Sequence, residues 1–188
     1  IAHNPTAGDY NLVSMTRETK GEGAWTGPTA LSNTGIWPRI ATTGDKVFVI
    51  YSHTDGGEDA DGFTMMAISS DNGATWDTTD MLLPGINAEN GYTAMSSDAY
   101  AIDARDSIVV IVAGGSYNDV RVWKSTDYGV TWSSKVAMDV GLDNFAGKEV
   151  TDITDIDGDG IGDTITAHDA AYELLIDADG IAHVWCGR

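Results

Sequence analysis

The sequence predicts an all-β protein, and its composition, its apolar runs and an internal repeat each indicate that class. Its 188 residues include 22 Gly and 20 Thr but only 7 Leu, and Asp supplies 23 of the 29 acidic residues. Helices favour Glu, Lys, Leu and Ala, whereas Asp, Gly and Thr are typical of turns and strands. The length fits one domain or a piece of a larger one, and 42% hydrophobic residues suffice for a buried core.

An eight-residue motif, S-x-D-x-G-x-T-W, occurs twice in the chain. Its two tryptophans, Trp76 and Trp132, lie 56 positions apart. Alternating runs rich in β-branched residues precede each copy, and such runs bounded by Gly, Asp and Asn predict strands joined by turns. The runs occupy residues 46–51, 63–68, 107–112 and 120–123.

Further strand patterns flank these two units. Residues 172–185 place a strand, an Asp-Gly turn and a second strand in the same order as residues 40–51, and residues 11–17 and 23–26 are similar to the last strands of an earlier unit. Each full unit offers about four short strands, which is typical of a β-propeller blade. The predicted organisation is the end of one blade (10–26), two full blades (36–78 and 92–134), an acidic loop (152–164) and the start of a further blade (165–188).

The predicted fold is therefore a segment of a β-propeller built from four-stranded antiparallel blades. A propeller closes with about four to eight blades, which hides the edges of its sheets. This chain has strands for about three blade equivalents, and it begins with Ile1 rather than Met. We therefore expect it to be a piece of a longer propeller, with the missing blades supplied by the parent chain or by a partner.

The repeated motif resembles the Asp-box, or BNR repeat, of sialidases and related β-propellers. The resemblance covers roughly residues 10 to 188 at the level of blades. It implies that the boxes lie at the blade periphery, away from the central ligand pocket, and are structural. The chemistry agrees, because Ser and Asp side chains can cap a tight turn, Gly accepts positive φ and Trp can pack on a sheet. The box residues are Ser69, Asp71, Gly73 and Trp76, with Ser125, Asp127, Gly129 and Trp132 in the second copy.

The acidic loop contains a candidate calcium site. Residues 155–163 read D-x-D-x-D-G-x-x-D, which is the ligand spacing of the first nine positions of a calcium loop, and Gly160 permits its sharp turn. Thr166 stands where an EF-hand has its bidentate Glu, so the loop resembles those of dockerins, thrombospondin type 3 repeats and integrin-like propellers. Without a cation its carboxylates would repel one another, although a solvated acidic turn is the alternative. The predicted ligands are Asp155, Asp157, Asp159, Asp163 and the backbone carbonyl of Ile161.

No catalytic residue is predicted. Sialidases use an arginine cluster whose first member lies in an F/Y-R-I-P motif, whereas this chain has Trp37-Pro38-Arg39-Ile40, with similar residues in a different order. Arg39 is therefore assigned to the start of a strand and not to catalysis. His168, Asp169 and Tyr172 begin the last blade, at a strand end that could reach a central cleft.

Charge and composition restrict the partners and the location. A net charge of -19 argues against nucleic acid, because phosphate contacts need clustered Lys and Arg. No run approaches the roughly 18 apolar residues of a membrane span. Cys186 is the sole cysteine, so no intrachain disulfide can form. An Asp-rich surface fits a calcium-rich exterior, which favours secretion or display at the cell surface.

These observations predict a non-catalytic, calcium-stabilised propeller module of a secreted or cell-surface protein, which binds a glycan or a protein. One alternative is a fragment of a sialidase-like glycoside hydrolase whose catalytic residues lie mostly in missing sequence. Another is a structural component of a larger surface assembly. Because fold alone does not fix function, the choice among them depends on the site.

Overall fold

The computed structural model describes residues 1–3, 11–54, 62–86, 99–115, 119–140, 155, 159–161 and 168–187. Every regular element in these ranges is a β-strand, which confirms the predicted all-β class. The same ranges contain no helix that could cross a membrane.

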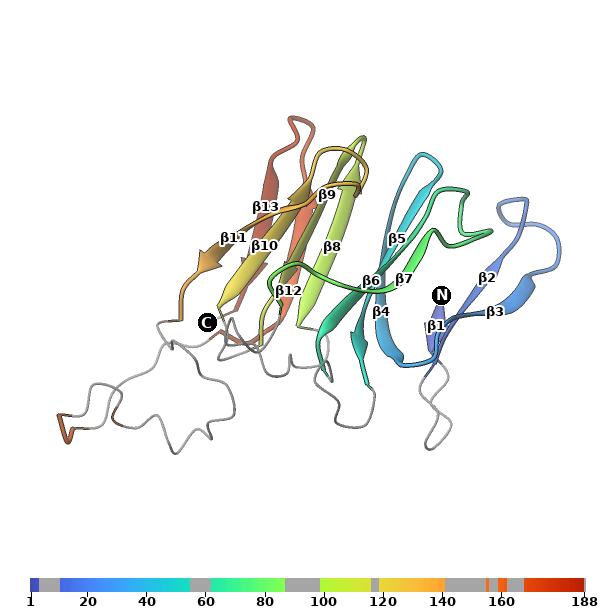
Figure 1. Cartoon of the computed structure of the whole chain (residues 1–188). Coiled ribbons are helices and arrows are strands. Elements are labelled where there is room, and N and C mark those ends of the chain that lie inside the picture. Colours follow the sequence, from blue (N-terminus) through green and yellow to red (C-terminus); the bar gives the residue numbers. More distant parts are fainter. Residues whose placement is uncertain are drawn as a thin grey trace.

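The strands form four antiparallel sheets that follow one another along the chain (Figure 1). Sheet 1 contains β1 (Ala2–His3), β2 (Leu12–Thr16) and β3 (Thr26–Ser32). Sheet 2 contains β4 (Gly35–Thr43), β5 (Lys46–His53), β6 (Thr64–Ser69) and β7 (Thr78–Leu82). Sheet 3 contains β8 (Tyr100–Arg105), β9 (Ile108–Ala113), β10 (Val120–Ser125) and β11 (Ser133–Met138). Sheet 4 contains β12 (Tyr172–Ile176) and β13 (Ala182–Cys186).

Sheets 2 and 3 are the two complete units of the repeat. In each of them, four strands are paired in chain order, β4-β5-β6-β7 and β8-β9-β10-β11, as the sequence predicts. The four sheets form an open stack in which the first strands lie closest together: β4 contacts β8, and β8 contacts β12. Among the described residues, the last strands β7 and β11 make no comparable contact with each other. The sheets therefore diverge from their first strands outward.

The second strand of each complete unit is buried on both faces. Along β5, Val47, Val49 and Tyr51 pack toward sheet 1. Phe48 and Ile50 lie on the opposite face and join the core shared with sheet 3. Double burial explains why residues 47–51 are all apolar instead of alternating with polar residues. Each such side chain contributes about 1.5–3 kcal/mol by leaving water.

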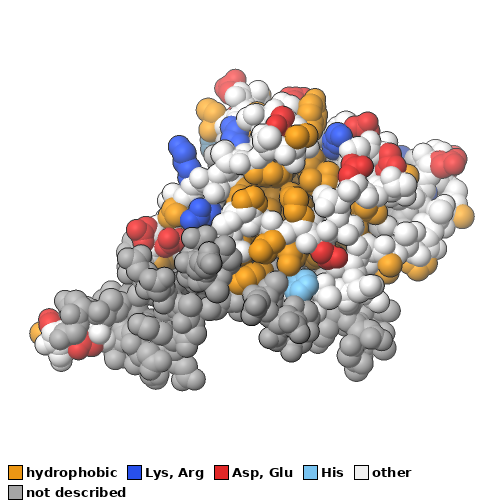
Figure 2. All heavy atoms as spheres, in the orientation of Figure 1, with side chains coloured by type: hydrophobic (Ala, Val, Ile, Leu, Met, Phe, Trp, Pro, Cys, Tyr) orange, Lys and Arg blue, Asp and Glu red, His pale blue; other side chains and the backbone are white. Residues whose placement is uncertain are grey.

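Three apolar layers hold the stack together, one between each pair of neighbouring sheets. The layer between sheets 2 and 3 includes the large side chains of Phe48, Met66 and Trp123. Leu12 and Leu31 extend the layer between sheets 1 and 2, and the remaining layer joins sheets 3 and 4. Figure 2 shows apolar side chains gathered across the middle of one face, with Asp and Glu toward its margins.

The strand boundaries differ from the expected ones in two places. The last strands of the complete units run past residues 78 and 134, to Leu82 and Met138, because the repeated motif joins the third strand to the fourth. Residues 23–25 belong to a connection, and the strand expected there begins at Thr26 and continues to Ser32. The motif therefore lies within each unit and does not mark its end.

Candidate functional site

The first Asp-box (residues 69–76) is a closed turn in which the side chains of Ser69, Asp71 and Thr75 are linked by hydrogen bonds. The Ser69 hydroxyl accepts the Gly73 N–H at 2.9 Å and donates to Asp71 Oδ1 at 2.8 Å. Asp71 also accepts the Thr75 N–H at 2.8 Å and the Thr75 hydroxyl at 2.6 Å. Gly73 has a φ of +81°, which glycine adopts without strain.

The second Asp-box (residues 125–132) repeats this geometry. Gly129 N–H donates to the Ser125 hydroxyl at 2.8 Å, and the Thr131 N–H donates to Asp127 Oδ1 at 2.9 Å. Hydrogen bonds from Thr131 and Ser125 lower the pKa of Asp127 to about 2, and those from Thr75 and Ser69 lower the pKa of Asp71 to about 2. Each carboxylate is a capping acceptor whose hydrogen bonds stay within its turn.

Each box is also tied to its own sheet. The N–H of Asn72 donates to the carbonyl of Asp45 at 2.8 Å, and the N–H of Tyr128 donates to that of Ser107 at 2.9 Å. Both carbonyls lie in the hairpin between the first two strands of the unit. Trp76 and Trp132 pack against the layers that join their sheets to the preceding ones. The expected structural role of the boxes agrees with this geometry.

The calcium loop is described only in part. Asp157 and Asp163 lie outside the described residues, whereas Asp155, Asp159 and Ile161 lie within them. Gly160 has a φ of +82° and donates its N–H to Asp155 Oδ2 at 2.9 Å, and Ile161 donates its N–H to Asp159 Oδ1 at 2.7 Å. The positive φ of Gly160 fits the sharp turn that the motif predicts at this residue. Their carboxylates are hard oxygen donors of the kind that Ca²⁺ prefers.

The residues at the starts of the first strands join neighbouring sheets. Tyr172 is buried, and its hydroxyl donates to the Gly114 carbonyl of sheet 3 at 2.8 Å. The buried ring of His168 lies 3.0 Å from the same hydroxyl through Nδ1. Asp169 caps the N–H groups of Ala171 and Gly187, both at 3.0 Å. The contacts described for these residues therefore hold sheet 4 in place.

Arg39 lies on β4, beside a bulge between Ile36 and Arg39. β4 is an edge strand of sheet 2. Pro38 has no N–H to donate, and an edge strand tolerates it because only one of its sides is paired. This segment belongs to the first strand of sheet 2, but Arg39 lies in the middle of β4 and not at its start as expected. The Arg39 side chain is exposed.

Sequence reasoning missed the polar residues that link sheets. Tyr100 begins β8 as Tyr172 begins β12, and its hydroxyl donates to the Trp37 carbonyl of sheet 2 at 2.6 Å. Asp80, on β7, accepts hydrogen bonds from Ser32 at 2.6 Å and from Tyr51 at 2.9 Å. Burial raises the pKa of the Tyr51 hydroxyl. The tyrosine at the start of both β8 and β12 was the available signal for the contacts of Tyr100 and Tyr172.

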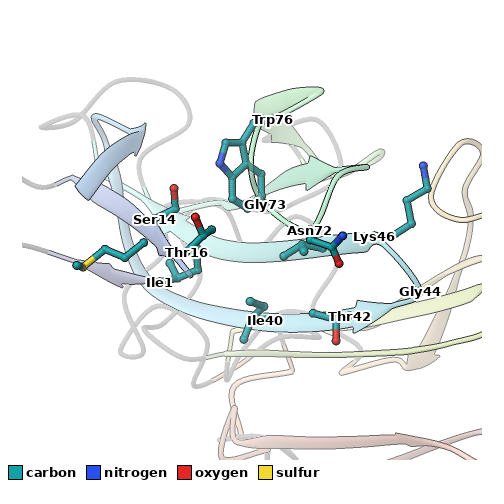
Figure 3. A pocket seen from close by; sticks show the side chains of 12 residues that line it. Ile1, Ser14, Thr16, Ile40, Thr42, Gly44, Lys46, Asn72, Gly73 and Trp76 are labelled. Carbon is teal, nitrogen blue, oxygen red and sulfur yellow. The ribbon is translucent and has the colours of Figure 1, made fainter. Parts of the chain in front are cut away.

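Sequence reasoning also missed a hollow of about 290 Å³ between sheets 1 and 2 (Figure 3). Ser14 and Thr16 of β2 line it from one side, and Ile40 of β4 lines it from another. Asn72 and Trp76 of the first box lie across from them. A wider groove of about 940 Å³ adjoins this hollow. The hollow and the groove share the lining residues Met15, Thr16 and Asn72.

Comparison with known proteins gives no match, either to a family model or to the sequence of a curated protein. The candidate function therefore depends on the geometry of the chain and on the motifs that it carries.

Proposed function

We propose that this chain is part of a secreted or cell-surface β-propeller of the Asp-box type, stabilised by calcium, which binds a glycan or a protein. One observation carries the proposal. Two boxes with the same hydrogen bonds join the third and fourth strands of two successive sheets, and the first strands of these sheets lie side by side. Sheets arranged around an axis require their first strands to converge in this way.

The described contacts of several polar side chains are structural, which supports a binding module as the first candidate. The polar side chains at the starts of β8 and β12 are engaged with neighbouring sheets, as Tyr100 and Tyr172 illustrate. Asp71 and Asp127 are engaged within their turns. Binding through loops on a rigid scaffold is a common use of such folds.

Calcium can be tested by thermal unfolding of the chain with CaCl₂ and with EDTA. A ligand that binds only the folded state raises its stability, by about 2.7 kcal/mol at a hundredfold excess over Kd. We expect EDTA to lower the melting temperature and Asp159→Asn to abolish the response. Asp179→Asn is the matched control, because Asp179 also precedes a glycine in an exposed turn. An equal melting temperature with CaCl₂ and EDTA would contradict the calcium site.

Binding can be tested by retention of the labelled chain on glycan and protein arrays, alongside turnover of an aryl sialoside. We expect retention without turnover. Hydrolysis of the sialoside would instead favour the glycoside hydrolase. A chain that is not retained on any array and does not hydrolyse the sialoside would contradict the proposed binding function.

A further inference from the structure

The connection between β2 and β3 (residues 17–25) occupies the position of an Asp-box in sheet 1. Trp25 directly precedes β3, just as Trp132 directly precedes β11. Gly21 and Gly23 have φ values of +84° and +82°, close to the +83° of Gly129. The S-x-D-x-G-x-T-W pattern is absent and the connection is longer, so the residues that follow β2 form an altered box.

The altered box stands apart from the first box, whereas the second box lies tight against sheet 2. A Cβ added to Gly129 would be 2.7 Å from the Phe48 ring, which leaves no space at that boundary. A Cβ added to Gly73 would meet nothing closer than Thr16 Cγ2 at 3.8 Å. Figure 3 shows Thr16 and Asn72 on the two sides of this gap. The groove of about 940 Å³, which we call the rim groove, continues outward from this gap. Its lining includes Arg17, Glu18, Lys20, Trp25 and Asp71.

The rim groove combines an aromatic ring with hydrogen-bonding side chains of both signs. Trp25 is 55% exposed, and the Arg17 guanidinium lies over one face of its ring, 4.7 Å from the ring centre. Arg17 and Lys20 supply donors, and Glu18 supplies acceptors. Asp71 also lines the groove, but its carboxylate is bonded to Ser69 and Thr75 within the first box. Two positive and two negative charges balance in this groove, although the whole chain carries -19.

This chemistry suits a neutral ligand rich in hydroxyl groups. A hydroxyl can donate to a carboxylate and accept from a guanidinium or ammonium, so it uses both kinds of partner at once. An exposed indole offers apolar area at a small cost in conformational entropy. An anionic ligand would meet the field of the whole acidic chain as well as the carboxylates of the groove.

We propose that the rim groove binds a neutral oligosaccharide, with a sugar ring stacked on the face of Trp25 opposite Arg17 and with Arg17 and Glu18 hydrogen-bonded to its hydroxyl groups. The proposal rests on the glycan-binding function above and gives it a place on the outer rim, between the altered box and the first box. This place is distinct from the starts of the first strands, where a central cleft was expected.

The test is titration of the ¹⁵N-labelled chain with a panel of neutral oligosaccharides, namely tetramers of glucose in α and β linkage, xylose, mannose and N-acetylglucosamine. Tetragalacturonate is the anionic comparison. We expect at least one neutral tetramer to shift the Trp25 indole resonance saturably, with that of Trp185 unmoved. Loss of the resonance in Trp25→Phe assigns it.

Trp25→Ala should weaken binding of that tetramer at least about tenfold, and Arg17→Ala should weaken it too. Trp185→Ala is the matched control, because Trp185 is 53% exposed but lies on β13, and its variant should bind as the unmodified chain does. Circular dichroism verifies that each variant is folded.

Three results would overturn the proposal: no shift of Trp25 with any neutral tetramer, unchanged binding by Trp25→Ala, or binding of tetragalacturonate alone. The first two can occur while the chain still binds a glycan elsewhere, which would leave the proposed function intact. Failure of that function would be seen separately, as no retention on any array.

Discussion

At the scale of single residues, the Asp-box owes its pattern to hydrogen-bond geometry. Asp71 and Asp127 each accept two hydrogen bonds from the threonine four positions later, and a serine two positions earlier donates a third. Only a short carboxylate reaches all three donors in so tight a turn. The same contacts favour the ionised form, so these residues couple the turn to pH.

The stability of the chain should therefore depend on Asp71 and Asp127 in acid. Their pKa of about 2 in the folded state lies below the ordinary 3.8, so the unfolded chain binds protons first as the pH falls. The contribution of these two carboxylates to the free energy of unfolding is present above about pH 4 and is lost as the pH falls toward 2. Urea unfolding between pH 2.5 and 6 should show a shallower pH dependence for Asp127→Asn. Asp45→Asn, at an exposed aspartate outside the boxes, should keep the original slope, and a slope unchanged in Asp127→Asn would contradict the assignment.

The two box glycines offer a second comparison. Gly73→Ala introduces a side chain at positive φ, which costs about 1–2 kcal/mol. Gly129→Ala has the same φ and also brings Cβ to 2.7 Å from the Phe48 ring. Urea unfolding should therefore show a larger loss of stability for Gly129→Ala. Equal losses would mean that the second box does not pack on sheet 2 as described.

At the scale of elements, neighbouring sheets are joined by polar contacts as well as by apolar layers. Tyr100 reaches from sheet 3 to sheet 2, and Tyr172 reaches from sheet 4 to sheet 3. Asp103 of β8 accepts the N–H of Ile176 in β12 at 2.7 Å. Such directional contacts fix how one sheet sits on the next, which apolar packing alone leaves less specified.

Removal of the Tyr172 hydroxyl should weaken the attachment of sheet 4. In Tyr172→Phe the buried Gly114 carbonyl loses this donor, which costs about 1–3 kcal/mol. The free energy of unfolding in urea measures the loss. Tyr128→Phe is the control, because Tyr128 is exposed in the second box. This change should leave the free energy of unfolding within about 0.5 kcal/mol of the original. Equal effects of the two changes would contradict the inter-sheet role.

At the scale of the whole molecule, protection from solvent should be greatest in the middle of the stack. β5 and β9 are paired on both sides and buried on both faces. The described part of sheet 4 has two strands, and Leu175 and Trp185 are exposed on it. Amide hydrogen exchange should therefore be slowest in β5 and β9 and faster in β13. Comparable protection of β13 would indicate that another chain covers sheet 4 in solution.

Local patterns determined much of this protein. The apolar runs specify β5 and β9, and the S-x-D-x-G-x-T-W motif specifies two turns whose hydrogen bonds lie within eight residues. The acidic spacing of residues 155–163 likewise predicts a sharp turn at Gly160, and this glycine has a positive φ. Interactions within a few residues can be read from the sequence because the chain itself sets the distances.

Contacts between sheets could not be read in this way. The pairing of Tyr172 with Gly114 spans 58 positions, and the rim groove depends on how far the residues that follow β2 stand from the first box. The S-x-D-x-G-x-T-W pattern that both turns share does not distinguish the open boundary at Gly73 from the filled one at Gly129. Only the tertiary structure decides between them. The Phe48 ring of sheet 2 fills the space beside Gly129, whereas Thr16 of sheet 1 leaves space beside Gly73.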